Sequence, residues 1–103
     1  MNALIAEHLD AIRTLCETHS VKRLYLIGSA LGDAFDPEHS DVDFVVEFRP
    51  NPPGRGFDHP YFKLLHELEA LLQRDVDLID VNAIENRFFR RTYERTREAL
   101  YAA

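Results

Sequence analysis

The sequence has a single cysteine, little positive charge and no apolar run of membrane length. Cys16 has no partner for an internal disulfide, and one cysteine fits a reducing compartment. No apolar stretch approaches the roughly 20 residues that a membrane-spanning helix needs. The N-terminal segment contains Glu7 and Asp10 and lacks the basic-then-apolar pattern of a signal peptide. We therefore expect a cytoplasmic protein without membrane contact.

Positive charge is also too scarce for a dedicated nucleic-acid binder. The formal net charge is −6, whereas phosphate contacts need a basic surface, so no direct nucleic-acid binding is expected. The 103 residues fit one small domain, residues 1–103, with room for a modest core but not for a separate acceptor-binding domain. The sequence has no GxGxxG pattern and no lysine in a P-loop position, which excludes those nucleotide-binding motifs.

Hydrophobic periodicity predicts six helices and strands. Apolar residues at helical spacing predict helices over residues 3–19, 61–72 and 83–101, and compact apolar runs predict strands over residues 22–28, 41–48 and 75–80. Residues 29–40 form an expected loop that opens with a short helical turn. The segment from Arg49 to His59 contains three prolines and two glycines and is expected to be irregular. The order α-β-β-α-β-α predicts an α+β fold, a small mixed sheet with helices on one face.

The second strand begins with two acidic residues, Asp41 and Asp43. A period of two places both side chains on one face of the strand, with Cα atoms roughly 7 Å apart. Two carboxylates so close repel each other, and a divalent cation between them relieves that repulsion. Mg²⁺ is the cation that such oxygen ligands suit, usually together with substrate phosphates.

Two further features belong with this pair. Gly28 and Ser29 follow the first strand, where glycine lets the backbone approach a phosphate and serine offers a hydroxyl and a backbone N–H. Asp77 interrupts the apolar third strand between Val76 and Leu78, whereas the acids at the ends of that strand are expected to meet water. Asp77 is therefore our candidate third carboxylate, with Asp75 as the alternative.

The motifs resemble the minimal nucleotidyltransferases of the DNA polymerase β superfamily. Leu-Ile-Gly-Ser-Ala-Leu-Gly-Asp at residues 26–33, Ser-Asp-Val-Asp-Phe-Val-Val at 40–46 and Arg-Asp-Val-Asp-Leu-Ile at 74–79 are similar to the MNT antitoxins of HEPN/MNT toxin–antitoxin pairs. The spacer between Ser29 and Asp41 has eleven residues where the family usually has ten. Leu31 stands where many members carry arginine or lysine.

The resemblance implies a site and its cofactors. Gly28 and Ser29 would hold the triphosphate of ATP, and Asp41, Asp43 and Asp77 would be catalytic and bind two Mg²⁺ ions. Asp77 would also accept the proton of the attacking hydroxyl. The last helix carries five arginines, which either form a solvated face or contact a triphosphate, a nucleotide or an acidic partner.

The leading hypothesis is an Mg²⁺-dependent nucleotidyltransferase that moves AMP from ATP to a hydroxyl. The resemblance implies that the acceptor is a tyrosine of a HEPN ribonuclease toxin, with which the chain would form a hetero-oligomer as its antitoxin. The alternative is a non-catalytic antitoxin, a binding subunit that neutralises its partner by steric contact. A third hypothesis is transfer to a small molecule or a tRNA end, with the acceptor pocket supplied by a partner subunit.

Overall fold

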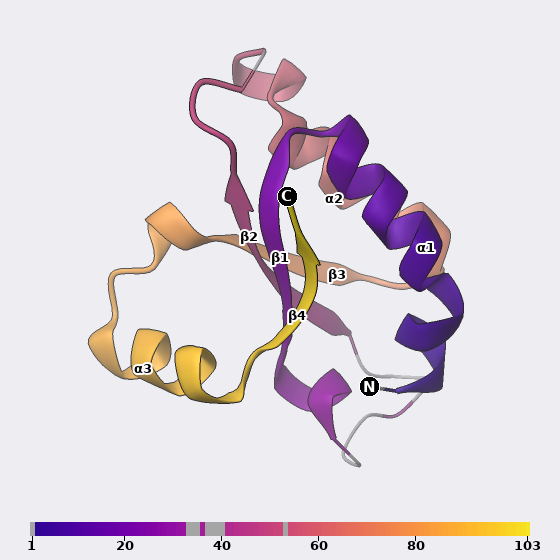
Figure 1. Ribbon diagram of the computed structural model, residues 1–103, viewed down its shortest axis with the longest axis vertical. Helices are drawn as coiled ribbons and strands as arrows, with labels where there is room; N and C mark the ends of the chain where they lie inside the picture. Colours follow the sequence, from indigo (N-terminus) through magenta and orange to yellow (C-terminus); the bar gives the residue numbers. More distant parts are fainter. Residues whose placement is uncertain (1, 33–35, 37–40, 53) are drawn as a thin grey trace.

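The computed structural model describes residues 2–32, 36, 41–52 and 54–103, and these contain three α-helices and one four-stranded sheet (Figure 1). Three short 3-10 helices, η1 to η3, join them. The order is α1 (Ala3–Thr18), β1 (Val21–Ile27), η1 (Gly28–Leu31), β2 (Val42–Phe48), η2 (Gly56–Asp58), α2 (Pro60–Leu72), β3 (Val76–Asp80), η3 (Val81–Ala83), α3 (Arg87–Thr96) and β4 (Glu98–Ala102).

The sheet has the strand order β3-β2-β1-β4 and is mixed. β1 is antiparallel to both β2 and β4. β2 and β3 are parallel, and α2 forms the crossover that a parallel pair requires. The α+β class and the mixed sheet predicted from the sequence are thus confirmed, whereas the predicted order α-β-β-α-β-α lacks the final strand β4.

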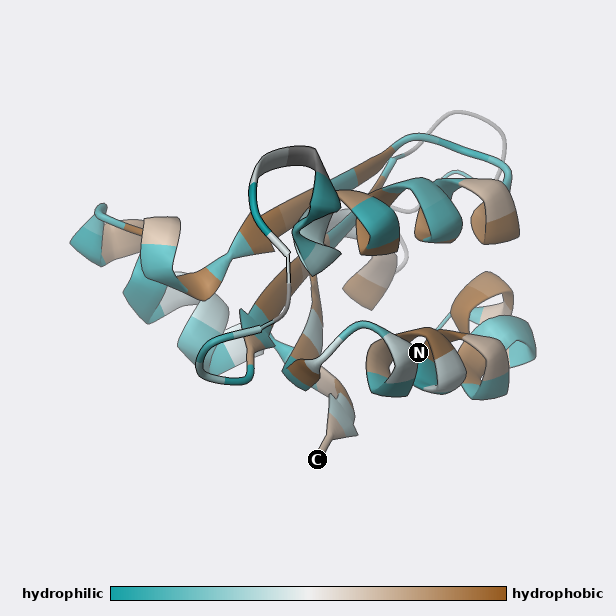
Figure 2. Ribbon diagram, turned by 90° about the horizontal axis from the view of Figure 1, so that it is seen from above, coloured by the Kyte–Doolittle hydropathy of each residue, from teal (hydrophilic) through white to brown (hydrophobic). Residues whose placement is uncertain are grey.

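One face of the sheet packs against α1 and α2, which also contact each other. Alternate strand residues point to this side, as the period of a strand dictates. The helices contribute the stripes predicted from their spacing, and Figure 2 shows the strands between the helices as largely hydrophobic. Buried residues of this core include Leu24, Leu26, Phe44, Val46, Ile5, Ile12, Cys16, Leu64, Leu68 and Leu72. Burial raises the pKa of the Cys16 thiol to about 12, so it stays protonated and unreactive.

Polar side chains fix where these two helices begin and how they meet β3. The Asn2 side chain accepts a hydrogen bond from the Ile5 N–H at 2.9 Å and caps α1. His59 caps α2 by accepting from the Tyr61 N–H, and Pro60 occupies the first helical turn. The Tyr61 hydroxyl then donates to the Leu78 carbonyl at 2.6 Å, which ties α2 to the middle of β3.

α3 lies on the opposite face of the sheet, and this corrects the expectation that all helices share one face (Figure 1). Tyr93 of α3 and Ile84 just before it pack with Ile27 of β1 and Val45 of β2. The physical reason is that β1 and β2 carry apolar residues at odd as well as even positions. Near-continuous apolar runs are typical of strands that are buried on both faces.

The C-terminal segment also differs from the predicted helix over residues 83–101. Asn86 accepts hydrogen bonds from the N–H groups of Phe88 and Phe89, so α3 begins after it. Arg97 leaves the helical conformation, and the next five residues form β4, in which Ala99 pairs with Tyr25. Leu100 therefore packs in the core beneath α1, on the other side of the sheet from Tyr93.

The two predicted connections are described in part. The expected helical turn at the start of the loop over residues 29–40 is η1, while residues 33–35 and 37–40 lie outside the described residues. The proline- and glycine-rich connection contains only the short η2 in its described part. Across residues 2–32, 41–52 and 54–103, no helix has the length and apolar character to cross a membrane.

The position of β4 leads to a stability prediction. Leu100 is 2% exposed, so Leu100→Ala is expected to lower the free energy of unfolding by about 2–5 kcal/mol in urea denaturation. Leu100→Val suits a strand and should cost about 1 kcal/mol. The control is Phe88→Ala on α3, because Phe88 is 79% exposed and surface changes usually stay within about 0.5 kcal/mol. An equal loss in Leu100→Ala and Phe88→Ala would contradict the buried position of β4.

Candidate active site

Asp43 and Asp77 lie directly opposite each other on the parallel strands β2 and β3. Residues paired in this way point to the same face of a sheet, and this is the face that α3 partly covers. Asp41 comes just before β2 and is exposed, and its distance of two residues puts it on the same side as Asp43. The structure therefore brings the three predicted carboxylates to one end of the β2–β3 pair.

The charges of Asp77 and Asp41 act on the Asp43 carboxyl. Burial raises the pKa of the Asp43 carboxyl above its ordinary value, and the charges of Asp77 and Asp41 raise it further. Asp75 is exposed and precedes β3, and its charge is not among the causes of this shift. The choice of Asp77 over Asp75 as the neighbour of Asp43 thus agrees with the geometry.

Gly28 stands where the turn after β1 meets Asp43. Its φ is +73°, in the left-handed region that glycine adopts most readily. A Cβ atom at this position would lie 2.5 Å from the Asp43 Oδ2 atom, closer than van der Waals contact permits. Only glycine allows the backbone turn and the carboxylate to approach each other in this way.

Ser29 is half-buried in η1 and does not line the pocket described below. The turn is held by two contacts: the Gly32 N–H donates to the Ser29 carbonyl at 3.2 Å, and the Asn2 side-chain amide donates to the Ala30 carbonyl at 3.2 Å. Asn2 thus caps α1 with its oxygen and holds the turn with its nitrogen. This role was not predicted from the sequence, since 28 residues separate Asn2 from Ala30.

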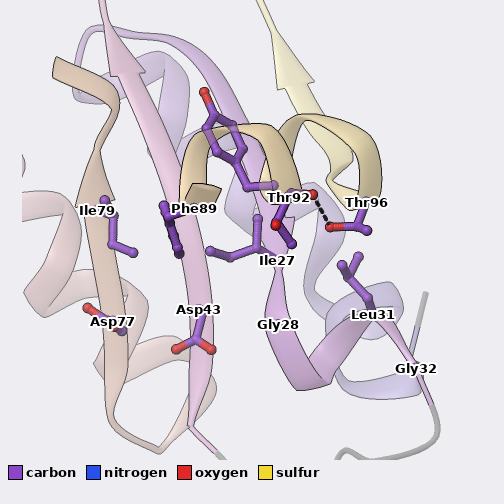
Figure 3. A pocket seen from close by; sticks show the side chains of 11 residues that line it. Ile27, Gly28, Leu31, Gly32, Asp43, Asp77, Ile79, Phe89, Thr92 and Thr96 are labelled. Atoms are coloured by element: carbon purple, nitrogen blue, oxygen red, sulfur yellow. Dashed lines mark hydrogen bonds between the residues drawn. The ribbon is translucent and has the colours of Figure 1, made fainter. Parts of the chain in front are cut away.

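A pocket of about 720 Å³ lies over Asp43 and Asp77, between α3 and the sheet (Figure 3), and Asp41 is not among its lining residues. Asp43, Asp77 and Gly28 line one side, and apolar residues of the strands and α3 line most of the rest. The pocket has the size that small-molecule sites usually have. The sequence predicted Phe89 and Tyr93 as one apolar stripe but not that α3 would roof the site. The remaining lining residues are Ile27, Leu31, Gly32, Ile79, Phe89, Thr92, Tyr93 and Thr96.

Lysine and arginine are missing from the described residues that line this pocket. The sequence contains no lysine or arginine between Arg23 and Arg49, and none of the described residues that line the pocket is basic. Two of the five arginines of the C-terminal segment are engaged elsewhere: Arg90 donates to the Ile84 carbonyl, and Arg97 stacks on the ring of Tyr25. The described residues that line the pocket therefore offer no cationic side chain to an anionic ligand.

The donor set suits a hard cation. In the described part of the chain, no three acidic, histidine or cysteine side chains form a group that could hold a metal ion. The facing pair Asp43 and Asp77, with Asp41 beside it, instead makes an open site. This fits Mg²⁺, which is usually bound by one or two carboxylates and keeps its other positions for water and substrate phosphates.

Comparison with known proteins decides the family. Residues 10–103 match the family described as polymerase beta, nucleotidyltransferase. The chain belongs to this family. This nucleotidyltransferase is 33% identical over 87 residues to the "putative protein adenylyltransferase" of Methanocaldococcus jannaschii. The match covers 80% of this chain and 79% of that protein.

Solved structures share the fold of this nucleotidyltransferase. The structure of a "putative minimal nucleotidyltransferase" superimposes with a TM-score of 0.73 at 27% identity, covering 91% of this chain and 90% of that one. A chain of the complex of a tri-AMPylated Shewanella oneidensis HEPN toxin with an MNT antitoxin matches with a TM-score of 0.65 at 18% identity, covering 95% and 72%. The predicted family resemblance is thus confirmed.

Two glycines of the turn provide a matched pair of variants. Gly28→Ala places a side chain at positive φ and against Asp43, so it should lower the free energy of unfolding by about 1–2 kcal/mol and abolish binding of Mg²⁺–ATP. Gly32→Ala should leave the free energy of unfolding unchanged, because no atom lies within 4 Å of its added Cβ and its φ is −142°. Urea denaturation and calorimetric titration measure the two effects. Equal behaviour of the two variants would contradict the close approach of Gly28 to Asp43.

Asp43 predicts a dependence of stability on pH. Because the pKa of Asp43 is raised in the folded protein above 3.8, the folded state binds more protons than the unfolded state just above that pH. The free energy of unfolding without metal should therefore fall as the pH rises through this window. Asp43→Asn removes this loss and should raise the melting temperature at pH 7 relative to the wild type.

Addition of Mg²⁺ should reverse the order of the melting temperatures of the wild type and Asp43→Asn. The ion should stabilise the wild type, in which it relieves the repulsion among the carboxylates, and leave Asp43→Asn nearly unchanged. Asp10→Asn, at an exposed position of α1, is the control and should respond as the wild type does. If Mg²⁺ raised the melting temperature of Asp43→Asn as much as that of the wild type, Asp43 would be excluded as a ligand.

Proposed function

We propose that the chain transfers AMP from ATP to a hydroxyl of a HEPN-type ribonuclease toxin and thereby acts as its antitoxin. The observation that carries the proposal is the facing pair Asp43 and Asp77 beside the Gly28 turn, in a chain of the nucleotidyltransferase family. Phosphoryl and nucleotidyl transfer require a place for the phosphates and carboxylates for metal ions in the same site. The acceptor is proposed to be a tyrosine of the toxin.

Each residue of the site then has a task. Asp41, Asp43 and Asp77 would hold two Mg²⁺ ions, and these would supply the positive charge that a triphosphate needs. The backbone of Gly28 and Ser29 binds the β- and γ-phosphates. Asp77 accepts the proton of the acceptor hydroxyl. A bond forms between the hydroxyl oxygen and the α-phosphorus, the bond from the α-phosphorus to the bridging oxygen breaks, and pyrophosphate leaves.

A protein acceptor agrees with the charge of the site. The region from residue 24 to residue 48 contains acidic side chains but no lysine or arginine, so a polyanionic acceptor such as tRNA would be repelled. The relative from Methanocaldococcus jannaschii is named as a protein adenylyltransferase, and the Shewanella oneidensis complex contains an AMPylated HEPN toxin. These relatives support a toxin as the acceptor of this chain.

A second candidate function is a binding subunit that neutralises the toxin by contact alone. It is favoured by one observation, namely that Leu31 and the other described pocket residues include no cation for the phosphates. Nucleotide transfer distinguishes the two candidates, because the binding subunit would inhibit the toxin without ATP.

The decisive experiment uses [α-³²P]ATP, Mg²⁺, the chain and the HEPN-type protein encoded beside it. Label is expected on the toxin, with loss of its ribonuclease activity, and only weak label on the chain alone. Asp77→Asn should bind Mg²⁺–ATP nearly as well as the wild type and slow transfer at least 100-fold, because it removes the base. Loss of ribonuclease activity without label would favour the binding subunit instead.

The control is the neighbouring acid. Asp75→Asn, just before the same strand and exposed as Asp77 is but not in the pocket, should transfer at the wild-type rate. Normal transfer by Asp77→Asn together with loss in Asp75→Asn would mean that the two assignments must be exchanged. Label on a small molecule or on tRNA, with the toxin unmodified, would exclude the protein acceptor but not nucleotidyl transfer.

A further inference from the structure

The pocket has an acidic end and an apolar end, and only the acidic end has a role in the proposed chemistry. Figure 3 shows Asp43 and Asp77 near one another, with Phe89 between Ile79 and Ile27 beyond them. Leu31 and Gly32 extend the pocket past the phosphate turn. The apolar part is therefore continuous with the place where a triphosphate would bind.

Phe89 is the only large aromatic side chain of the described pocket residues that remains well exposed. It is 37% exposed, whereas Tyr93 beside it is 3% exposed. Its ring lies 6.0 Å from the Tyr93 ring at an angle of 35°, so Tyr93 supports it from within the fold. A flat apolar ring that is held in this way and open to a pocket is suited to stacking with a second flat ring.

We propose that the apolar end of the pocket binds the nucleobase of the nucleoside triphosphate and that Phe89 is its stacking face. This inference rests on the proposed nucleotidyl transfer, since that reaction puts a triphosphate at the acidic end. A pocket of about 720 Å³ is large enough for a base and a ribose next to that triphosphate. Stacking on an aromatic side chain tolerates any base, because every base has a π-face.

The side chain of the acceptor is the competing occupant, and the geometry disfavours it. The acceptor hydroxyl must approach in line with the bond that breaks, from the side opposite the leaving pyrophosphate. The pocket, however, includes Gly28, Leu31 and Gly32 of the phosphate turn, which is the side of the leaving group. The pocket is thus continuous with the donor nucleotide.

The walls also indicate how the base is recognised. Apart from the two carboxylates, the side-chain hydrogen-bonding groups of the described pocket residues are the hydroxyls of Thr92, Tyr93 and Thr96. The Thr96 hydroxyl already donates to the Thr92 carbonyl at 2.8 Å. A hydroxyl both donates and accepts, so it serves an amino group and a carbonyl oxygen alike. The inference therefore predicts similar affinities for adenine and guanine nucleotides.

Two ligands distinguish the contribution of the base to binding from that of the phosphates. In the presence of Mg²⁺, the chain is titrated calorimetrically with α,β-methylene ATP, which cannot transfer AMP, and with inorganic tripolyphosphate. The nucleotide is expected to bind the wild type at least tenfold more tightly. Phe89→Ala should lose about tenfold in nucleotide affinity and keep its affinity for tripolyphosphate, which also reports that the variant is folded.

Three variants sharpen the test. Phe89→Tyr retains a ring and should bind as the wild type does, whereas Phe89→Leu fills the space beside Tyr93 without a flat face and should behave as Phe89→Ala does. Phe88→Ala removes the adjacent ring, which is 79% exposed and not in the pocket, and should change nothing. Equal affinity of the wild type for the two ligands would overturn the inference and leave nucleotidyl transfer standing. An equal loss for both ligands in the Phe89 variants would also overturn it.

Failure of the proposed function gives a different result. If the wild type binds neither ligand with Mg²⁺ present, the nucleotidyl transfer fails and the base site fails with it. Base selectivity is measured with α,β-methylene GTP in the same titration. Dissociation constants within tenfold of the ATP analogue support recognition by stacking and hydroxyls, and a larger difference contradicts it.

Discussion

The site depends on the parallel pairing of β2 with β3, which sets Asp43 opposite Asp77. Two like charges on paired residues of neighbouring strands lower the stability of the fold, so other contacts must hold the strands together against this repulsion. The apolar contacts of α1 and α2 on the far face do this, and Tyr61 adds a hydrogen bond to the Leu78 carbonyl beside Asp77. The core thus stabilises an arrangement of carboxylates that is electrostatically unfavourable by itself.

The antiparallel pairing of β1 with β2 adds the second constraint, because it places Ile27 opposite Asp43 and so brings Gly28 to the carboxylate. A slip of one residue would move Asp43 to the face of α1 and α2 and would put Phe44 in the site. The register is protected by the alternation along β2, in which Phe44 and Val46 are buried in the main core. Hydrophobic packing on one face of the sheet therefore fixes the position of Asp43 beside Gly28 on the other face.

The sequence carried the chemistry of the site more clearly than its surroundings. Gly28, Asp43 and Asp77 stand at the ends or in the middle of apolar runs, and such runs report strands directly. The position of α3 depended on long-range packing: Phe89, Tyr93 and Leu100 fit one helical stripe, yet β4 pairs with β1 and turns Leu100 to the opposite core. Local periodicity cannot distinguish a long helix from a short helix followed by an edge strand when the deciding hydrogen bonds come from a distant strand. The Asn86 cap was the local signal for the start of α3.

The scarcity of positive charge relates the acidic end of the pocket to its apolar end. None of the described residues that line the pocket is basic, so in the proposed reaction a nucleotide would be repelled until metal ions bind, and metal and triphosphate would bind together. The remaining affinity must then come from groups that carry no charge, and in the described pocket these are the apolar walls and hydroxyls supplied by the strands and α3. On the proposed function, a helix on the second face of the sheet has a place in the site: Asp43 and Asp77 would hold the ions that bind the triphosphate, and α3 would contact the base.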